Sequence, residues 1–297
     1  MRIDGSPYMK NEIFDCMLKS ELSSSEVSLL LWLIQRQDQN GNIFGVHYRT
    51  VCDGIKISIQ TFYTALKGLS DKGFINYVKN HYTDYDVTVK NNTFRNNNER
   101  RGYFNITAAL FSMDKFHALK APEKLLLIYI YRFYKTNNAT YQIEKRKFLR
   151  KWMGTFKVSR RILLSYIRTL KVQRFISFGE RDGKYFFTPL KYVTETDERE
   201  EKIDRKHFHR NFVIALCRRY KYRFDNESVK DVMHLIDQYV NIANVYKKNV
   251  LECLNNVLKK VHKIALQLKN ETFLKAKLIH FHLKMEIMYG GVENVTE

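Results

Sequence analysis

The sequence predicts a mostly helical α+β fold, in which one small unit occurs twice and is followed by a helical domain. The first observation is an internal repeat, because the pattern of residues 22–75 recurs about a hundred residues later. The second is charge: 51 Lys and Arg residues against 31 Asp and Glu residues give a formal net charge of +20. The third is a set of amphipathic stretches after residue 206, which are typical of packed helices.

Composition limits the class of protein. The chain has 297 residues, enough for two or three domains, and 44% of them are hydrophobic, which favours a folded chain. The four cysteines lie far apart and form no C-x-x-C pair, so we interpret them as separate thiols in a reducing compartment. No apolar run approaches the roughly 18 residues of a membrane span, and the polar N-terminus lacks a signal-peptide core. We therefore expect a cytoplasmic protein without a membrane partner.

The basic charge is uneven. Residues 107–198 hold 19 basic against 8 acidic residues, whereas residues 1–106 hold 13 against 11. A polyanion would exploit such an imbalance, and a merely soluble surface would not need it. An anionic membrane surface is the alternative, but no long basic amphipathic helix stands out.

The first copy of the repeat begins with Ser23 and Glu26, which have the spacing of a capping box before an apolar helix through Ile34. Ser58 is placed to cap a later helix, and Gly73 is placed to end it in the left-handed conformation. The other elements predicted here are a strand at 43–46, a helix at 48–53 and two strands at 74–79 and 85–90.

The second copy repeats this order. Pro122 lies in the first helical turn, Ser159 has the capping position of Ser58, and Asp182-Gly183 is a typical hairpin turn. Strands are predicted at 140–143, 175–179 and 184–188, and a helix at 145–153. The offset between the copies is 97 at Glu26 and Glu123 but 101 at Ser58 and Ser159, so four residues are inserted between these points.

Helix, strand, helix, helix and hairpin is the order of a winged helix. The runs at 24–31, 58–66 and 71–75 resemble the first and recognition helices of tandem winged-helix DNA-binding proteins, including plasmid and phage replication initiators of bacteria. The resemblance covers roughly residues 8–192. It implies a winged helix in each of residues 1–106 and 107–194, with a linker and helical domain in 195–297. Lys56 and Lys157 stand where such turns often carry glycine, which predicts a looser turn.

The third helix of each copy is the candidate DNA reader. Packing Phe62, Leu66 and Leu69 inward turns the opposite face toward solvent. Arginine and glutamine there can pair with a base edge in the major groove, whereas lysines farther along suit phosphates. The candidates on these helices and their caps are Ser58, Gln60, Thr61, Tyr63, Thr64 and Lys67 in the first copy, and Ser159, Arg160, Arg161, Ser165 and Arg168 in the second.

Further candidates lie outside these helices. An Asn-rich stretch at 91–101 carries Arg95, Arg100 and Arg101, which could reach a minor groove or the DNA backbone, or could belong to a mobile loop. Phosphate-positioning residues are expected on the second helix of the second copy and on its hairpin tip: Lys145, Lys147, Lys151, Arg181 and Lys184.

The C-terminal third begins with a charged stretch at 194–206, which is either a linker or the exposed start of a helix. Three or four helices are predicted after it, at about 207–224, 227–245, 247–268 and 271–288. A bundle for dimerisation or for binding a replication or transcription partner is the default interpretation, with a ligand-sensing bundle as the alternative. His280 and His282 have the His-hydrophobe-His pattern of metal-dependent nicking enzymes. However, Leu274, Leu278, Phe281, Met285 and Met288 recur at helical spacing, and two histidines on opposite faces of a helix cannot chelate one metal.

No phosphate-binding G-x-x-x-x-G-K-[ST] motif and no catalytic constellation stands out, so we expect neither an enzyme nor a cofactor or metal. The sequence favours a double-stranded DNA-binding protein. Its expected role is replication initiator of a plasmid, phage or mobile element, with transcription regulator as the alternative.

Overall fold

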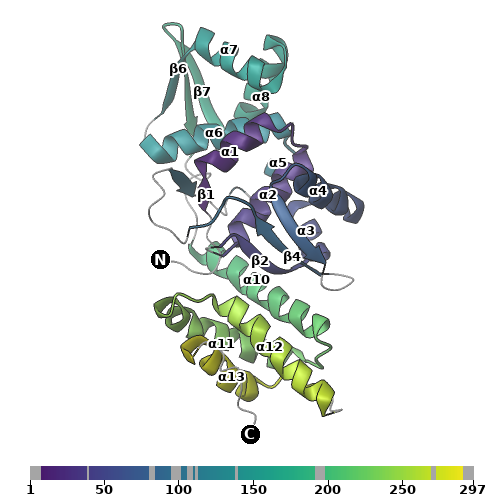
Figure 1. Cartoon of the computed structure of the whole chain (residues 1–297). Helices are drawn as coiled ribbons and strands as arrows, with labels where there is room; N and C mark the ends of the chain where they lie inside the picture. The colour runs from purple at the N-terminus through teal and green to yellow at the C-terminus, as the bar shows by residue number, and fades with distance from the viewer. Residues whose placement is uncertain are drawn as a thin grey trace.

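The computed structural model describes residues 8–38, 40–79, 84–94, 102–105, 110, 113–137, 140–190, 198–268 and 272–289. The chain is mostly helical with small antiparallel sheets, which confirms the α+β class. Figure 1 shows the second copy of the repeat at one end, the first copy in the middle and the C-terminal helices at the other end.

The first repeat unit, residues 24–89, runs from helix α2 to strand β4. Its elements are α2 (Ser24–Arg36), β2 (Asn42–His47), α3 (Tyr48–Ile55), α4 (Ile59–Asp71), β3 (Ile75–Lys79) and β4 (Asp84–Val89). The antiparallel sheet has the order β2-β4-β3. Around this unit lie β1 (Tyr8–Lys10), α1 (Asn11–Lys19) and β5 (Tyr103–Asn105), and β1 pairs with β5.

The second repeat unit, residues 121–189, has the same element order. Its elements are α6 (Ala121–Asn137), β6 (Tyr141–Glu144), α7 (Lys145–Phe156), α8 (Arg160–Val172), β7 (Ile176–Arg181) and β8 (Lys184–Pro189), preceded by the short α5 (Asp114–His117). The sheet order β6-β8-β7 matches that of the first unit. The repeat in the sequence is therefore a repeat of topology.

The four-residue insertion is a turn of helix. α3 has 8 residues and α7 has 12, while β2 and β6 both lead directly into these helices. Four residues are close to one 3.6-residue turn, so the insertion lengthens the helix and leaves its buried face in phase. Both α7 and α3 end at a lysine in the left-handed conformation, Lys157 at φ 51° and Lys56 at φ 56°.

Those two lysines correct an expectation. The turn between the second and third helices is closed rather than loose, because the N–H groups of Lys56 and Lys157 donate to the carbonyls of Cys52 and Met153. The capping predictions are confirmed: Ser23 forms a capping box with Glu26, and the side chains of Ser58 and Ser159 accept from backbone N–H groups of the next helix.

The two units share one hydrophobic core. It runs continuously from Met9 to Phe187 and includes the buried leucines of α2 and α6, which pack against each other. At this contact Lys124 of α6 is 1% exposed. Its Nζ donates to Ser24 Oγ and Ser28 Oγ at 2.7 Å, to His117 O at 3.0 Å and to Ser24 O at 3.3 Å. Burial lowers the pKa of Lys124 to about 8.

We expect Lys124→Met to destabilise the chain by about 2–4 kcal/mol, because buried oxygen acceptors of both units lose their donor. The effect depends on pH. The folded pKa of Lys124 lies below the unfolded value near 10.5, so the unfolded chain holds more protons between pH 8 and 10. The stability of the wild type relative to Lys124→Met should therefore rise across that window. Urea denaturation of both proteins at pH 7, 8, 9 and 10 measures it, and a difference that falls with pH would contradict this account.

The C-terminal helices form a second core. They are α10 (Glu198–Arg219), α11 (Asn226–Val245), α12 (Val250–Gln267) and α13 (Ala276–Tyr289). α10 begins at Glu198, inside the charged stretch, so the start of a helix was the correct one of the two interpretations given to it; Glu, Arg and Lys are good helix formers. In α13 the buried residues are Ile279, Leu283 and Ile287, and Phe281 is exposed.

Candidate nucleic-acid interface

Helix α8 of the second unit presents a basic face to solvent. Ser159 caps it by accepting from the N–H of Ile162, while Leu163, Ile167 and Leu170 are buried beneath it. Arg160, Arg161, Ser165 and Arg168 are exposed on the opposite side, as predicted. The guanidinium groups of Arg160 and Arg161 therefore stand at the amino end of the helix, which is the end that enters a major groove in helix-turn-helix proteins.

Helix α7 and the β7–β8 hairpin add basic side chains beside α8, and several are held by neighbours. Lys145 pairs with Glu180, and Lys147 Nζ lies 3.0 Å from Glu144 Oε1. Lys151 Nζ donates to the hydroxyl of Tyr129 at 2.7 Å and lies over its ring. The ammonium groups of these three lysines therefore already have partners within the chain, in contacts that are weak where they are exposed. Arg181 and Lys184 are exposed at the hairpin tip, where Arg181 contacts only a neighbouring carboxylate, Asp182, among the ion pairs of the described residues.

The corresponding face of the first unit is different in character. Gln60, Thr64 and Lys67 are exposed on α4, while Ser58 Oγ and Thr61 Oγ1 lie 2.8 Å apart. Tyr63 is half-buried, with its ring 6.3 Å from that of Tyr48 and 6.4 Å from that of Tyr85. Burial, followed by the neighbouring hydroxyl of Tyr63, raises the pKa of Tyr85 to about 12. Tyr63 is thus part of a packed tyrosine cluster.

Charge separates the two units. α7 and α8 together contain nine Lys and Arg residues and no acidic residue. α3 and α4 contain two basic residues, Arg49 and Lys67, and two acidic ones, Asp53 and Asp71. The extra turn of α7 contributes to this difference by lengthening the basic helix. Because phosphate contacts dominate affinity for nucleic acid, the second unit is the stronger candidate for backbone binding.

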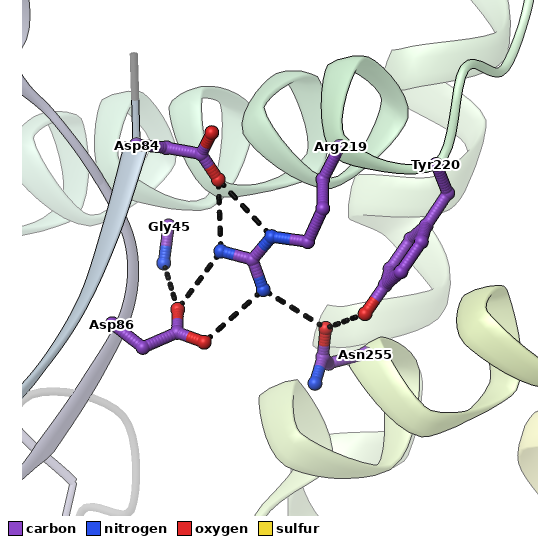
Figure 2. A network of polar contacts seen from close by, with 6 residues as sticks. All are labelled: Gly45, Asp84, Asp86, Arg219, Tyr220 and Asn255. Atoms are coloured by element: carbon purple, nitrogen blue, oxygen red, sulfur yellow. Dashed lines mark hydrogen bonds and ion pairs between the residues drawn. The ribbon is translucent and has the colours of Figure 1, made fainter. Parts of the chain in front are cut away.

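Helix α10 covers part of the outer face of the first unit's sheet, at β2 and β4. Figure 2 shows Arg219 of α10 between Asp84 and Asp86 of β4. Its guanidinium donates to Asp84 Oδ2 at 2.8 and 3.1 Å and to Asp86 at 2.9 and 3.2 Å. Asn255 of α12 accepts a further bond from Arg219 at 3.3 Å and one from Tyr220 at 2.9 Å. Burial disfavours the charge of Arg219, but the two carboxylates outweigh it and raise its pKa.

Close backbone approach supports the same contact. Gly45 of β2 has φ +66° and donates its N–H to Asp86 Oδ1 at 2.9 Å. A Cβ at this position would lie 3.0 Å from Ala215 Cβ of α10. A glycine therefore allows the helix to lie directly on the strand, where a larger residue would meet both strain and a clash.

The second unit lacks the residues for such a contact. His47 is the last residue of β2 and pairs with Asp84, the first residue of β4. Likewise Glu144 is the last residue of β6 and pairs with Lys184, the first residue of β8. By this register Lys184 and Phe186 occupy the positions of Asp84 and Asp86. The repeat thus provides an internal comparison: the two aspartates that bind Arg219 of α10 have no acidic counterpart in the second unit. The equivalent sheet face of the second unit keeps Lys184 exposed.

Some predicted residues cannot be placed. Arg95, Arg100 and Arg101 lie outside the described residues. Sequence reasoning missed the docking role of Arg219, whose partners are 133 and 135 positions away along the chain. An acidic pair on a strand of an otherwise basic protein was the available signal.

Within the described ranges, no group of three or more His, Cys, Asp or Glu side chains could hold a metal ion. His280 and His282 lie in helix α13, as their apolar neighbours predicted. None of the helices in the described part of the chain is both long and apolar enough to cross a lipid bilayer. No protein-family model matches the chain, and comparisons with curated proteins and with solved structures find no match.

Proposed function

We propose that this chain is a sequence-specific double-stranded DNA-binding protein, and that its two repeat units are winged helices with α4 and α8 as recognition helices. The observation that carries the proposal is the surface of α7 and α8, whose charged residues are all basic and, apart from the half-buried Lys145, all exposed. A duplex backbone carries one negative charge per roughly 1.7 Å, which such a surface complements. The capped amino end of α8 supplies arginines of the kind that read guanine edges.

In this proposal the two repeat units make different kinds of contact with DNA. The second unit supplies most phosphate contacts and the strongest base reader, Arg161. The first unit, with Gln60 and Thr64 on a nearly neutral face, adds selectivity through hydrogen bonds to bases. Two recognition helices on one rigid core would enter successive major grooves, about 34 Å apart on one side of the duplex.

Binding should depend steeply on salt. If several phosphates are neutralised by α7, α8 and the hairpin, affinity for a duplex should fall by orders of magnitude between about 50 and 200 mM salt. Fluorescence anisotropy with a labelled duplex of 30 base pairs measures the slope. A flat profile would remove phosphate binding from the account.

The role in the cell that we propose is initiation of replication of a plasmid, phage or mobile element. Control of transcription is the other role that fits such a DNA-binding protein. A genome-wide map of bound sites separates them. Clustered repeats beside an AT-rich origin support initiation, whereas single sites that overlap promoters support regulation.

A further inference from the structure

Helix α13 is apolar on two opposite faces. One face holds Ile279, Leu283 and Ile287 and packs into the C-terminal core. The other face holds Leu278, Phe281, Met285 and Met288; Leu278 is 42% and Phe281 61% exposed, and the two methionines are half-buried. Since one apolar face already packs into the core, the second, exposed apolar face is a surface that another element can cover.

The spacing of the apolar residues on the exposed face indicates that a second helix covers it. Leu278, Phe281, Met285 and Met288 are separated by three, four and three residues, which is the a and d pattern of a coiled-coil seam. Such a seam packs against a second helix. The side chains of the second helix insert between the a and d side chains of the first. A flat membrane surface does not require this register.

Charge identifies the partner. In the heptad set by this seam, Lys277 and Lys284 occupy the g positions, and both are exposed. The e positions hold His282 and Tyr289, so the seam has no acidic flank. The one glutamate of α13, Glu286, points away to Lys260 and Asn256 of α12. In an antiparallel pair, a second copy would place lysine opposite lysine, and in a parallel pair it would offer no carboxylate to either lysine.

We propose that the outer face of α13 docks an acidic amphipathic helix of a partner protein, with apolar residues in the seam and glutamates facing Lys277 and Lys284. This interaction is independent of DNA binding by the repeat units. Two heptads bury a small area, so the contact is a transient one.

The test uses the full chain and two 21-residue helical peptides with leucine at a and d. One peptide carries glutamate at e and g, and the other carries lysine there. The glutamate peptide should bind at least tenfold more tightly, and the preference should reverse for Lys277→Glu/Lys284→Glu. Phe281→Asp should abolish binding with unchanged circular dichroism, because Phe281 is exposed.

Three results would overturn the proposal. Equal or absent binding of the two peptides removes the charge-matched seam. Light scattering that shows a dimer dissolved by Phe281→Asp assigns the face to a second copy of this chain. Binding to vesicles with 30% anionic lipid that is lost in Phe281→Asp, without peptide discrimination, assigns it to a membrane surface.

Discussion

Replacing Arg219 by methionine is expected to lower the free energy of unfolding by about 3–5 kcal/mol, because it leaves two carboxylates beside each other without their cation. The side chains of Arg219 and Asp84 are 7% and 1% exposed, so water has little access to replace the bonds that Asp84 loses. Asp84 Oδ1 already has no hydrogen-bond partner among the described residues. Equilibrium urea denaturation, followed by circular dichroism and by tyrosine and tryptophan fluorescence, measures the loss.

Two controls isolate the buried network. Arg218→Met alters the adjacent, exposed arginine, which contacts His47 at 3.2 Å, and should cost less than about 1 kcal/mol. Adding Asp84→Asn and Asp86→Asn to Arg219→Met should restore part of the stability, because the like charges are removed. Equal losses of unfolding free energy for Arg218→Met and Arg219→Met, or no recovery in the triple variant, would contradict this account. The ion pairs of Arg219 with Asp84 and Asp86 would then not stabilise the docking of α10.

Reversing the charge of Arg161 should weaken duplex binding by about two orders of magnitude, since Arg161→Glu loses a base contact and adds repulsion from phosphates. The repeat offers a matched control: Gln60 occupies the equivalent position of α4. Gln60→Glu introduces the same side chain on a nearly neutral face and should cost about tenfold or less. Both residues are exposed, so thermal unfolding should change little in either variant.

The comparison has a clear contrary result. If Gln60→Glu and Arg161→Glu weaken binding equally, the two units contribute equally to affinity. The proposal that the second unit supplies most of the affinity is then wrong. If neither changes binding, the recognition helices are not the DNA-binding surface. Anisotropy titrations at one fixed salt concentration distinguish these outcomes.

Local chemistry was predictable from sequence because it depends on near neighbours. Ser58 and Ser159 cap helices that begin one residue later, and Asp182-Gly183 forms a turn with φ values of 50° and 69°. The inward faces of α4 and α8 also followed from spacing alone. The candidate residues on α8 were found in the same way, since a helix that buries Leu163 and Ile167 must expose Arg161 and Arg168.

Long-range contacts were not predictable from one sequence. Nothing in the pattern around Arg219 points to Asp84, because the two meet only when α10 lies on β2. The sequence around Lys124 is typical of a surface lysine. Its burial results from the packing of α2 against α6. In α13, two apolar stripes share one helix, and spacing alone does not say which stripe faces the core. Each of these cases depends on tertiary packing.

The central claim is that the chain recognises a specific duplex, and selection from random double-stranded DNA tests it most directly. Full-length protein is taken through several rounds of selection at about 150 mM salt, and the affinity for the enriched sequence is compared with that for a scrambled one. The account predicts one enriched motif, bound at least about a thousandfold more tightly than the scrambled duplex, with that ratio reduced in Arg161→Ala. No enrichment, or equal affinity for both duplexes, would contradict it.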